Sequence, residues 1–147
     1  MSAVDVRCTA LLVMEVQRGV VARLGDAGML DRLSRAIGAA RAAGLRVIHV
    51  TVGFRPGHPE VSARNRSFSA LRDSGRFAAG DPAAEIHPAA APQPGEVVVT
   101  KRRVGAFSGS DLDVVVSTAA RFACQTRLCR PNPACAGCPW FLPVCPG

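Results

Sequence analysis

The feature that most limits the possible folds of this chain is a set of three short apolar runs. A helical segment separates the first two. The runs are TALLVMEV at residues 9–16, RVIHVTV at 46–52 and EVVVTK at 96–101. Continuous apolar runs of this length are typical of strands buried on both faces. A strand–helix–strand order predicts a right-handed crossover into a parallel sheet. We therefore expect an α/β fold with a three-layer, Rossmann-like parallel sheet.

The segments between these runs have different characters. Apolar residues recur at helical spacing over residues 29–43, and Gly44 follows where a helix commonly ends. Residues 53–95 are rich in Gly, Pro and polar side chains, which predicts a long loop that covers a site. After the third run, Ser110 is placed to cap the start of another helix.

The chain changes character near residue 123. Residues 123–147 hold five of the six cysteines, many prolines and no acidic residue, and they show neither helical nor strand periodicity. An α/β sheet of this kind needs further strands, and this segment does not supply them. We expect a domain at residues 1–122 whose sheet is incomplete at its C-terminal end, followed by an irregular Cys/Pro-rich tail at 123–147.

Three explanations of this tail stay open. GC-rich DNA read in a shifted frame yields Pro, Arg, Ala and Cys, and this is the explanation we favour. A metal knuckle is the second, because Cys135 and Cys138 have ligand spacing and Cys129 and Cys145 lie nearby. A plain tail is the third. The tail contains no histidine and no second C-x-x-C pair to support a metal site. We expect no bound metal and no cofactor.

Composition and charge exclude several classes of function. The formal net charge is +7, but the arginines are scattered and tyrosine is absent, so we expect no nucleic-acid partner. No apolar run is long enough to span a membrane, and no signal peptide is visible at the start. We expect a cytosolic protein with no membrane partner.

Lys101 is the only lysine in the chain, against seventeen arginines, and it ends the third apolar run. A buried ammonium group can exchange protons near neutral pH, whereas a guanidinium group cannot. This position predicts a lysine that works in a site. The alternative is a solvated charge at the end of a strand, beside Arg102 and Arg103.

Two segments together resemble the isochorismatase-like cysteine hydrolases. TALLVMEVQRGVV is similar to the motif of their first strand, and VVVTKRRVGAFSGSDLD is similar to the motif of their third. The resemblance covers residues 8 to about 118 in the family's order. It implies a doubly wound parallel sheet, a small-molecule substrate with an amide, ureido or vinyl-ether group, and a homo-oligomer as one expectation.

The resemblance also implies the residues of the site. Glu15 stands where the family has an aspartate base, and Lys101 stands at the family's lysine. Cys135 lies 34 residues after Lys101, close to the separation that the family motif implies for the nucleophile. Gln17 and Phe107 are implied to contact the substrate. We expect Glu15 and Lys101 to meet at the carboxyl ends of neighbouring parallel strands.

Departures from the family pattern keep rival functions open. Glu15 is one methylene longer than aspartate, Gly105 replaces a serine, and the family's A-T-x-x-C turn is missing. We therefore expect a hydrolase whose activity is impaired. The alternatives are a non-catalytic pseudoenzyme that binds a small molecule or a sibling subunit, and a Cys-rich metal-binding protein.

Overall fold

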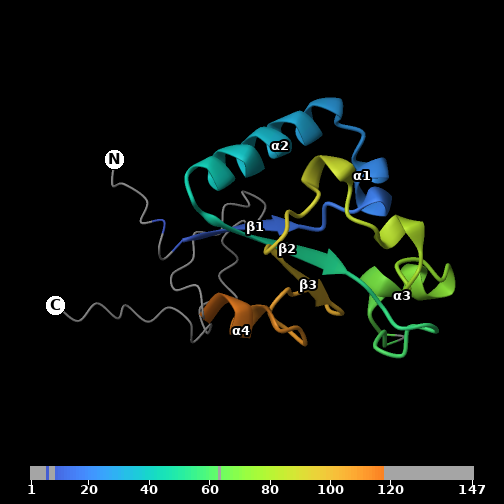
Figure 1. The fold of residues 1–147 in the computed structure, drawn as a ribbon. Helices are drawn as coiled ribbons and strands as arrows, with labels where there is room; N and C mark the ends of the chain where they lie inside the picture. Colours follow the sequence, from blue (N-terminus) through green and yellow to red (C-terminus); the bar gives the residue numbers. More distant parts are fainter. Residues whose placement is uncertain (1–5, 7–8, 63, 118–147) are drawn as a thin grey trace, which may run out of the picture.

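The protein is built around a parallel sheet with helices on both faces (Figure 1). The computed structural model describes residues 6, 9–62 and 64–117 of the 147-residue chain. The strands are β1 (Ala10–Met14), β2 (Arg46–Val52) and β3 (Val97–Lys101). β2 lies between the other two, and both pairs are parallel. The strands and the three-layer α/β architecture that the apolar runs predict are thus confirmed.

Within residues 9–62 and 64–117, four α-helices and two short 3₁₀ helices accompany the strands. They are α1 (Arg18–Leu24), α2 (Ala27–Ala42), α3 (Arg66–Asp73), α4 (Leu112–Ser117), η2 (Pro82–Ala84) and η3 (Pro88–Ala90). The Asp26 carboxylate accepts the Gly28 N–H at 2.9 Å at the start of α2. Gly44 takes a left-handed φ of 73° just after α2, as expected of a glycine that ends a helix. Ser110 Oγ accepts the Leu112 N–H at 3.2 Å, as expected of a capping side chain.

Each face of the sheet has its own apolar cluster. Val13, Val47 and Ala90 pack with Ile37 and Ala40 of α2 on one face. On the other face, β-strand residues pack with Leu112 and Val116 of α4, which are 0% and 2% exposed. This two-sided burial explains why the strands read as continuous apolar runs rather than as alternating patterns.

The segment between β2 and β3 is more structured than its composition predicts. We expected residues 53–95 to be mostly loop, whereas they contain α3, η2 and η3. Phe54 and Phe77, each 3% exposed, anchor a third apolar cluster with Val52 and Val61. The expectation underestimated this segment because its few apolar residues are spread widely and find their partners only in the folded chain.

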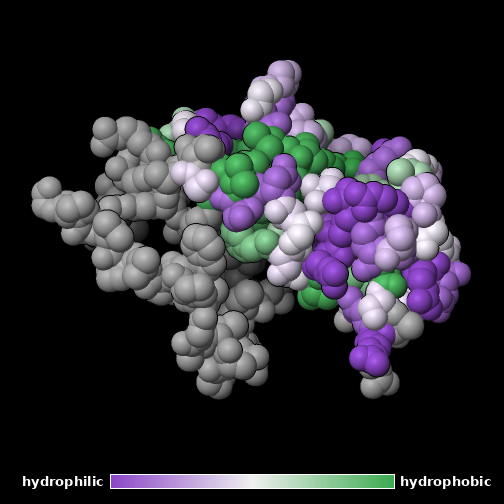
Figure 2. All heavy atoms as spheres, turned by 90° about the horizontal axis from the view of Figure 1, so that it is seen from below, coloured by the Kyte–Doolittle hydropathy of each residue, from purple (hydrophilic) through white to green (hydrophobic). Residues whose placement is uncertain are grey.

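Exposed apolar side chains lie on β3, on α4 and on the loop that joins them: Val97, Val98, Val104, Phe107 and Val114. Viewed from below, apolar surface occupies the middle of the molecule, and hydrophilic surface dominates to its right (Figure 2). None of the helices in the described part of the chain has the length and apolar character that crossing a lipid bilayer requires.

Candidate active site

The centre of the candidate site is an ion pair between Glu15 and Lys101. Lys101 is the last residue of β3 and is 3% exposed, and its Nζ also donates a hydrogen bond to Val104 O at 2.7 Å. Both residues lie at the carboxyl edge of the sheet, where open α/β sheets place their sites. One detail of our expectation is wrong. The two residues do not end neighbouring strands, because β2 lies between β1 and β3.

The backbone of Glu15 makes this contact possible. Side chains alternate between the faces of a strand, so an extended β1 would place residue 15 on the same face as Val13, beside α2. Lys101 follows Val99, which packs on the opposite face. Glu15 leaves the extended conformation with a left-handed φ of 57°. For a residue other than glycine this conformation costs about 1–3 kcal/mol, and such strain clusters at functional sites.

Gln17 holds the backbone near the site in place and does not line a pocket. Its side chain is fully buried, and the amide Nε2 donates to Val52 O at 2.8 Å and to Ala84 O at 2.6 Å. The amide Oε1 accepts the Val52 N–H at 2.8 Å. The side chain therefore ties the end of β2 to η2, and it has no exposed surface for the substrate contact that the family motif implies.

A pocket of about 230 Å³ opens beside Glu15, and we call it the Glu15 pocket. Its walls are mainly apolar and come from α1, β2, α3 and the segment after α3: Val20, Leu24, Val52, Phe68, Leu71 and Phe77. Glu15 and Arg23 are the charged residues in its lining. An apolar pocket with a few convergent polar groups is the usual form of a small-molecule site.

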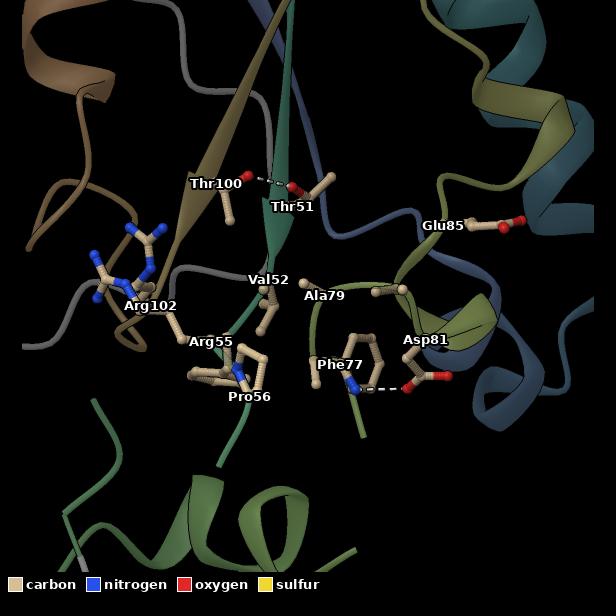
Figure 3. A pocket seen from close by; sticks show the side chains of 15 residues that line it. Thr51, Val52, Arg55, Pro56, Phe77, Ala79, Asp81, Glu85, Thr100 and Arg102 are labelled. Atoms are coloured by element: carbon tan, nitrogen blue, oxygen red, sulfur yellow. Dashed lines mark hydrogen bonds between the residues drawn. The ribbon is translucent and has the colours of Figure 1, made fainter. Parts of the chain in front are cut away.

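A second pocket of about 430 Å³ lies at the ends of β2 and β3, and we call it the β2–β3 pocket (Figure 3). The Thr51 and Thr100 hydroxyl oxygens in its lining are 3.3 Å apart. Asp81 also lines it and accepts the N–H groups of Ala83 at 2.9 Å and Phe77 at 2.6 Å. These backbone hydrogen bonds, the one from Ala83 first, lower the pKa of Asp81, so its carboxylate stays ionised.

Comparison with known proteins identifies the family. A model of the isochorismatase domain matches residues 9–121. The chain belongs to the isochorismatase family. A solved isochorismatase family protein from Desulfovibrio vulgaris subsp. vulgaris str. Hildenborough is 28% identical, with a TM-score of 0.67 over 77% of this chain and 62% of that one. A cysteine hydrolase from Pseudomonas syringae pv. phaseolicola 1448A is 27% identical, with a TM-score of 0.69 over 80% of this chain and 57% of that one.

A more distant neighbour is the N-carbamoylsarcosine amidase from Thermoplasma acidophilum. It is 24% identical, with a TM-score of 0.59 over 76% of this chain and 61% of that one, and shows likeness of fold alone. The chain therefore spans about three fifths of the length of these isochorismatase-like structures. A search of curated proteins found no match.

The remaining expected site residues lie apart from this centre. Phe107 is 53% exposed and is not among the residues that line the two pockets. Cys135 lies outside the described residues, as do the whole 123–147 segment and the other five cysteines. The assignment of Cys135 as nucleophile therefore stays a prediction for this isochorismatase-family chain.

The histidines have structural partners. His49 is 1% exposed, and its Nε2 lies 2.9 Å from Glu96 Oε2. His58 Nε2 lies 2.7 Å from Arg76 O, and His87 accepts the Ala89 N–H at the start of η3. Among residues 6, 9–62 and 64–117, no three His, Cys, Asp or Glu side chains gather closely enough to hold a metal ion.

Our reasoning from the sequence missed three residues that shape the site. Arg55 and Arg102 line the β2–β3 pocket, and both approach Glu60, which we had left unassigned. Arg102 was considered only as a neighbour of Lys101. The single available signal was the presence of Arg55 and Glu60 in the polar loop after β2, and charge in a loop is too common to single out a pair.

Proposed function

We propose that this chain is an isochorismatase-like hydrolase acting on a small molecule with an amide, ureido or vinyl-ether group. The observation that carries the proposal is the contact of Glu15 with buried Lys101 beside the Glu15 pocket. The pair joins a carboxylate that can accept a proton to an ammonium group that can stabilise developing negative charge.

The chemistry requires a third group. With an amide or ureido substrate, the thiolate attacks the carbonyl carbon, and the carboxylate takes the thiol proton and passes it to the leaving amine. Water then hydrolyses the acyl-enzyme, and the ammonium group favours the thiolate at the start of the reaction. Cys135 is the candidate for this role on the family motif. Glu15 carries the carboxylate one methylene further out than aspartate does, and a displacement of about 1 Å can reduce a rate by roughly a hundredfold. We accordingly propose weak rather than efficient turnover.

The test is a substrate panel of nicotinamide, ureidoacetate and isochorismate, with release of product measured for wild type and variants. Weak turnover of one compound that is lost in Lys101→Ala and in Cys135→Ala supports the proposal. Lys101→Arg is the matched variant, because it keeps the charge but replaces the compact ammonium with a planar fork. Turnover that survives Lys101→Ala would show that the ion pair has no catalytic role.

A second candidate function is a small-molecule binding domain without catalysis. It is favoured by the departures from the family motif, because the A-T-x-x-C turn is missing and Glu15 stands in place of an aspartate. For this candidate, the panel compounds bind to wild type with no turnover, and Lys101→Ala weakens that binding. Calorimetric titration of the same panel separates the two functions.

A further inference from the structure

Two arginines share one carboxylate at the rim of the β2–β3 pocket. Arg55 Nη1 lies 2.7 Å from Glu60 Oε1, and Arg102 Nε lies 3.3 Å from the same oxygen. Glu60 is largely buried, and burial acts to raise its pKa. Hydrogen bonds from the N–H groups of Glu60 and Arg55 and from the Arg55 guanidinium outweigh this effect, so the pKa is lowered. The ionised carboxylate leaves the three-residue cluster with one excess positive charge.

The cluster is also incompletely hydrogen-bonded. The buried Arg102 Nε forms an ion pair with Glu60 Oε1 but no hydrogen bond, and the buried Glu60 Oε2 also has no hydrogen-bond partner among the described residues. Buried polar atoms are nearly always hydrogen-bonded, and an unpaired one calls for an explanation. A guanidinium group that has donors free of hydrogen bonds and lies in a cluster of net positive charge is suited to binding a carboxylate.

The opposite side of the pocket carries the opposite charge. Arg55 and Arg102 lie on one side and Asp81 and Glu85 on the other (Figure 3). Asp81 is occupied by two backbone N–H groups, and Glu85 lies 3.1 Å from Arg18. The acidic side therefore has its own partners, but its negative charges disfavour a second anionic group on the ligand.

The β2–β3 pocket adjoins the Glu15 pocket, with which it shares two lining residues. Val52 and Phe77 line both this pocket and the Glu15 pocket. Thr100, Lys101 and Arg102 are consecutive in the chain, and alternation along β3 directs Lys101 away from the side on which Thr100 lines the β2–β3 pocket.

We propose that the β2–β3 pocket is a subsite for the carboxylate of the substrate, held by Arg102 and Arg55. The substrate is then a short monocarboxylic acid whose remainder lies against Val52 and Phe77. This inference rests on the proposed function, because it specifies which of the amide, ureido or vinyl-ether compounds fit. The pocket volume of about 430 Å³ is within the range of small-molecule sites.

The experiment is a calorimetric titration of the full chain with three probes. They are ureidoacetate, its neutral amide ureidoacetamide, and the dianion N-carbamoylaspartate. Wild type is expected to bind ureidoacetate about tenfold more tightly than either other probe, since one charge-assisted hydrogen bond is worth roughly a factor of ten in affinity. Arg102→Gln is expected to bind ureidoacetate about tenfold more weakly and the neutral amide unchanged.

Arg103→Gln is the matched control, because Arg103 is the next residue, is exposed and does not line the pocket. It makes the same change in net charge and is expected to bind all three probes as wild type does. If Arg102→Gln folds poorly, Arg55→Gln tests the same prediction, since Arg55 is the other arginine proposed to hold the carboxylate. Equal loss of ureidoacetate affinity in the Arg102 and Arg103 variants would overturn the proposal, as would equal affinity of wild type for ureidoacetate and its amide.

Release of ammonia from ureidoacetate separates this inference from the proposed function. Hydrolysis that depends on Lys101, with no effect of Arg102→Gln on binding, overturns the subsite and leaves the hydrolase standing. Binding that depends on Arg102, with no hydrolysis that depends on Lys101, supports the subsite and removes the hydrolase.

Discussion

Glu96 is expected to be a large electrostatic contributor to the stability of the fold. Its carboxylate accepts from Arg41 Nε and Nη2, each at 2.8 Å, and it contacts buried His49. These contacts connect the last turn of α2 with β2 and with the start of β3. The hydrogen bond with Arg41, opposed by burial and supported by Gln93 and His49, lowers the pKa of Glu96 from 4.5 to about 2.

The change to make is Glu96→Gln, which keeps the shape and removes the charge. The lowering of the Glu96 pKa from 4.5 to about 2 corresponds to about 3 kcal/mol of stability. The pKa is lower in the folded state, so this stability is fully present above pH 4.5 and is lost as the pH falls toward 2. We expect the variant to be about 3 kcal/mol less stable than wild type at pH 7 and about 1 kcal/mol less stable at pH 3.

Urea denaturation followed by circular dichroism at both pH values measures these differences. Glu85→Gln is the matched control, because Glu85 also forms an ion pair with an arginine but its side chain is 61% exposed. A surface pair of this kind contributes about 0–1 kcal/mol. Equal destabilisation by the two substitutions at pH 7 would refute the reasoning, as would a Glu96→Gln effect that does not change with pH.

Four further substitutions test the site, its supports and α2. Gln17→Leu removes three hydrogen bonds to the backbone of β2 and η2, and we expect a loss of about 3 kcal/mol or more in urea denaturation. Gly19→Ala places a methyl group 2.8 Å from Ala83 Cβ, so we expect the free energy of unfolding to fall by about 1–3 kcal/mol. Gly38→Ala has open space around it and should instead stabilise α2 by about 0.5–1 kcal/mol. Glu15→Asp restores the family's shorter carboxylate, and we expect kcat/KM to rise by about tenfold or more on any compound that wild type turns over. An unchanged or lower kcat/KM would count against Glu15 as the base.

The resemblance to the isochorismatase-like hydrolases located part of the site from the sequence alone. The motifs at Glu15 and Lys101 pointed to the carboxyl edge of the sheet, and the structure brings these two side chains together. The same motifs suggested a substrate contact for Gln17, which the structure buries completely. A motif shows that a residue type is required at a position, but it does not say whether the side chain faces the ligand or the backbone.

The sequence by itself determined the three parallel strands and α2. Strands buried on both faces leave continuous apolar runs, and a helix buried on one face leaves apolar residues at helical spacing. Only the tertiary structure decided how Glu15 reaches Lys101. Alternation along regular strands would put the two residues on opposite faces, and the left-handed backbone at Glu15 reverses this. The Arg55–Glu60–Arg102 cluster was likewise beyond reach, since it joins the loop after β2 to the end of β3. Contacts between residues far apart in the chain leave no periodic trace, so only folding reveals them.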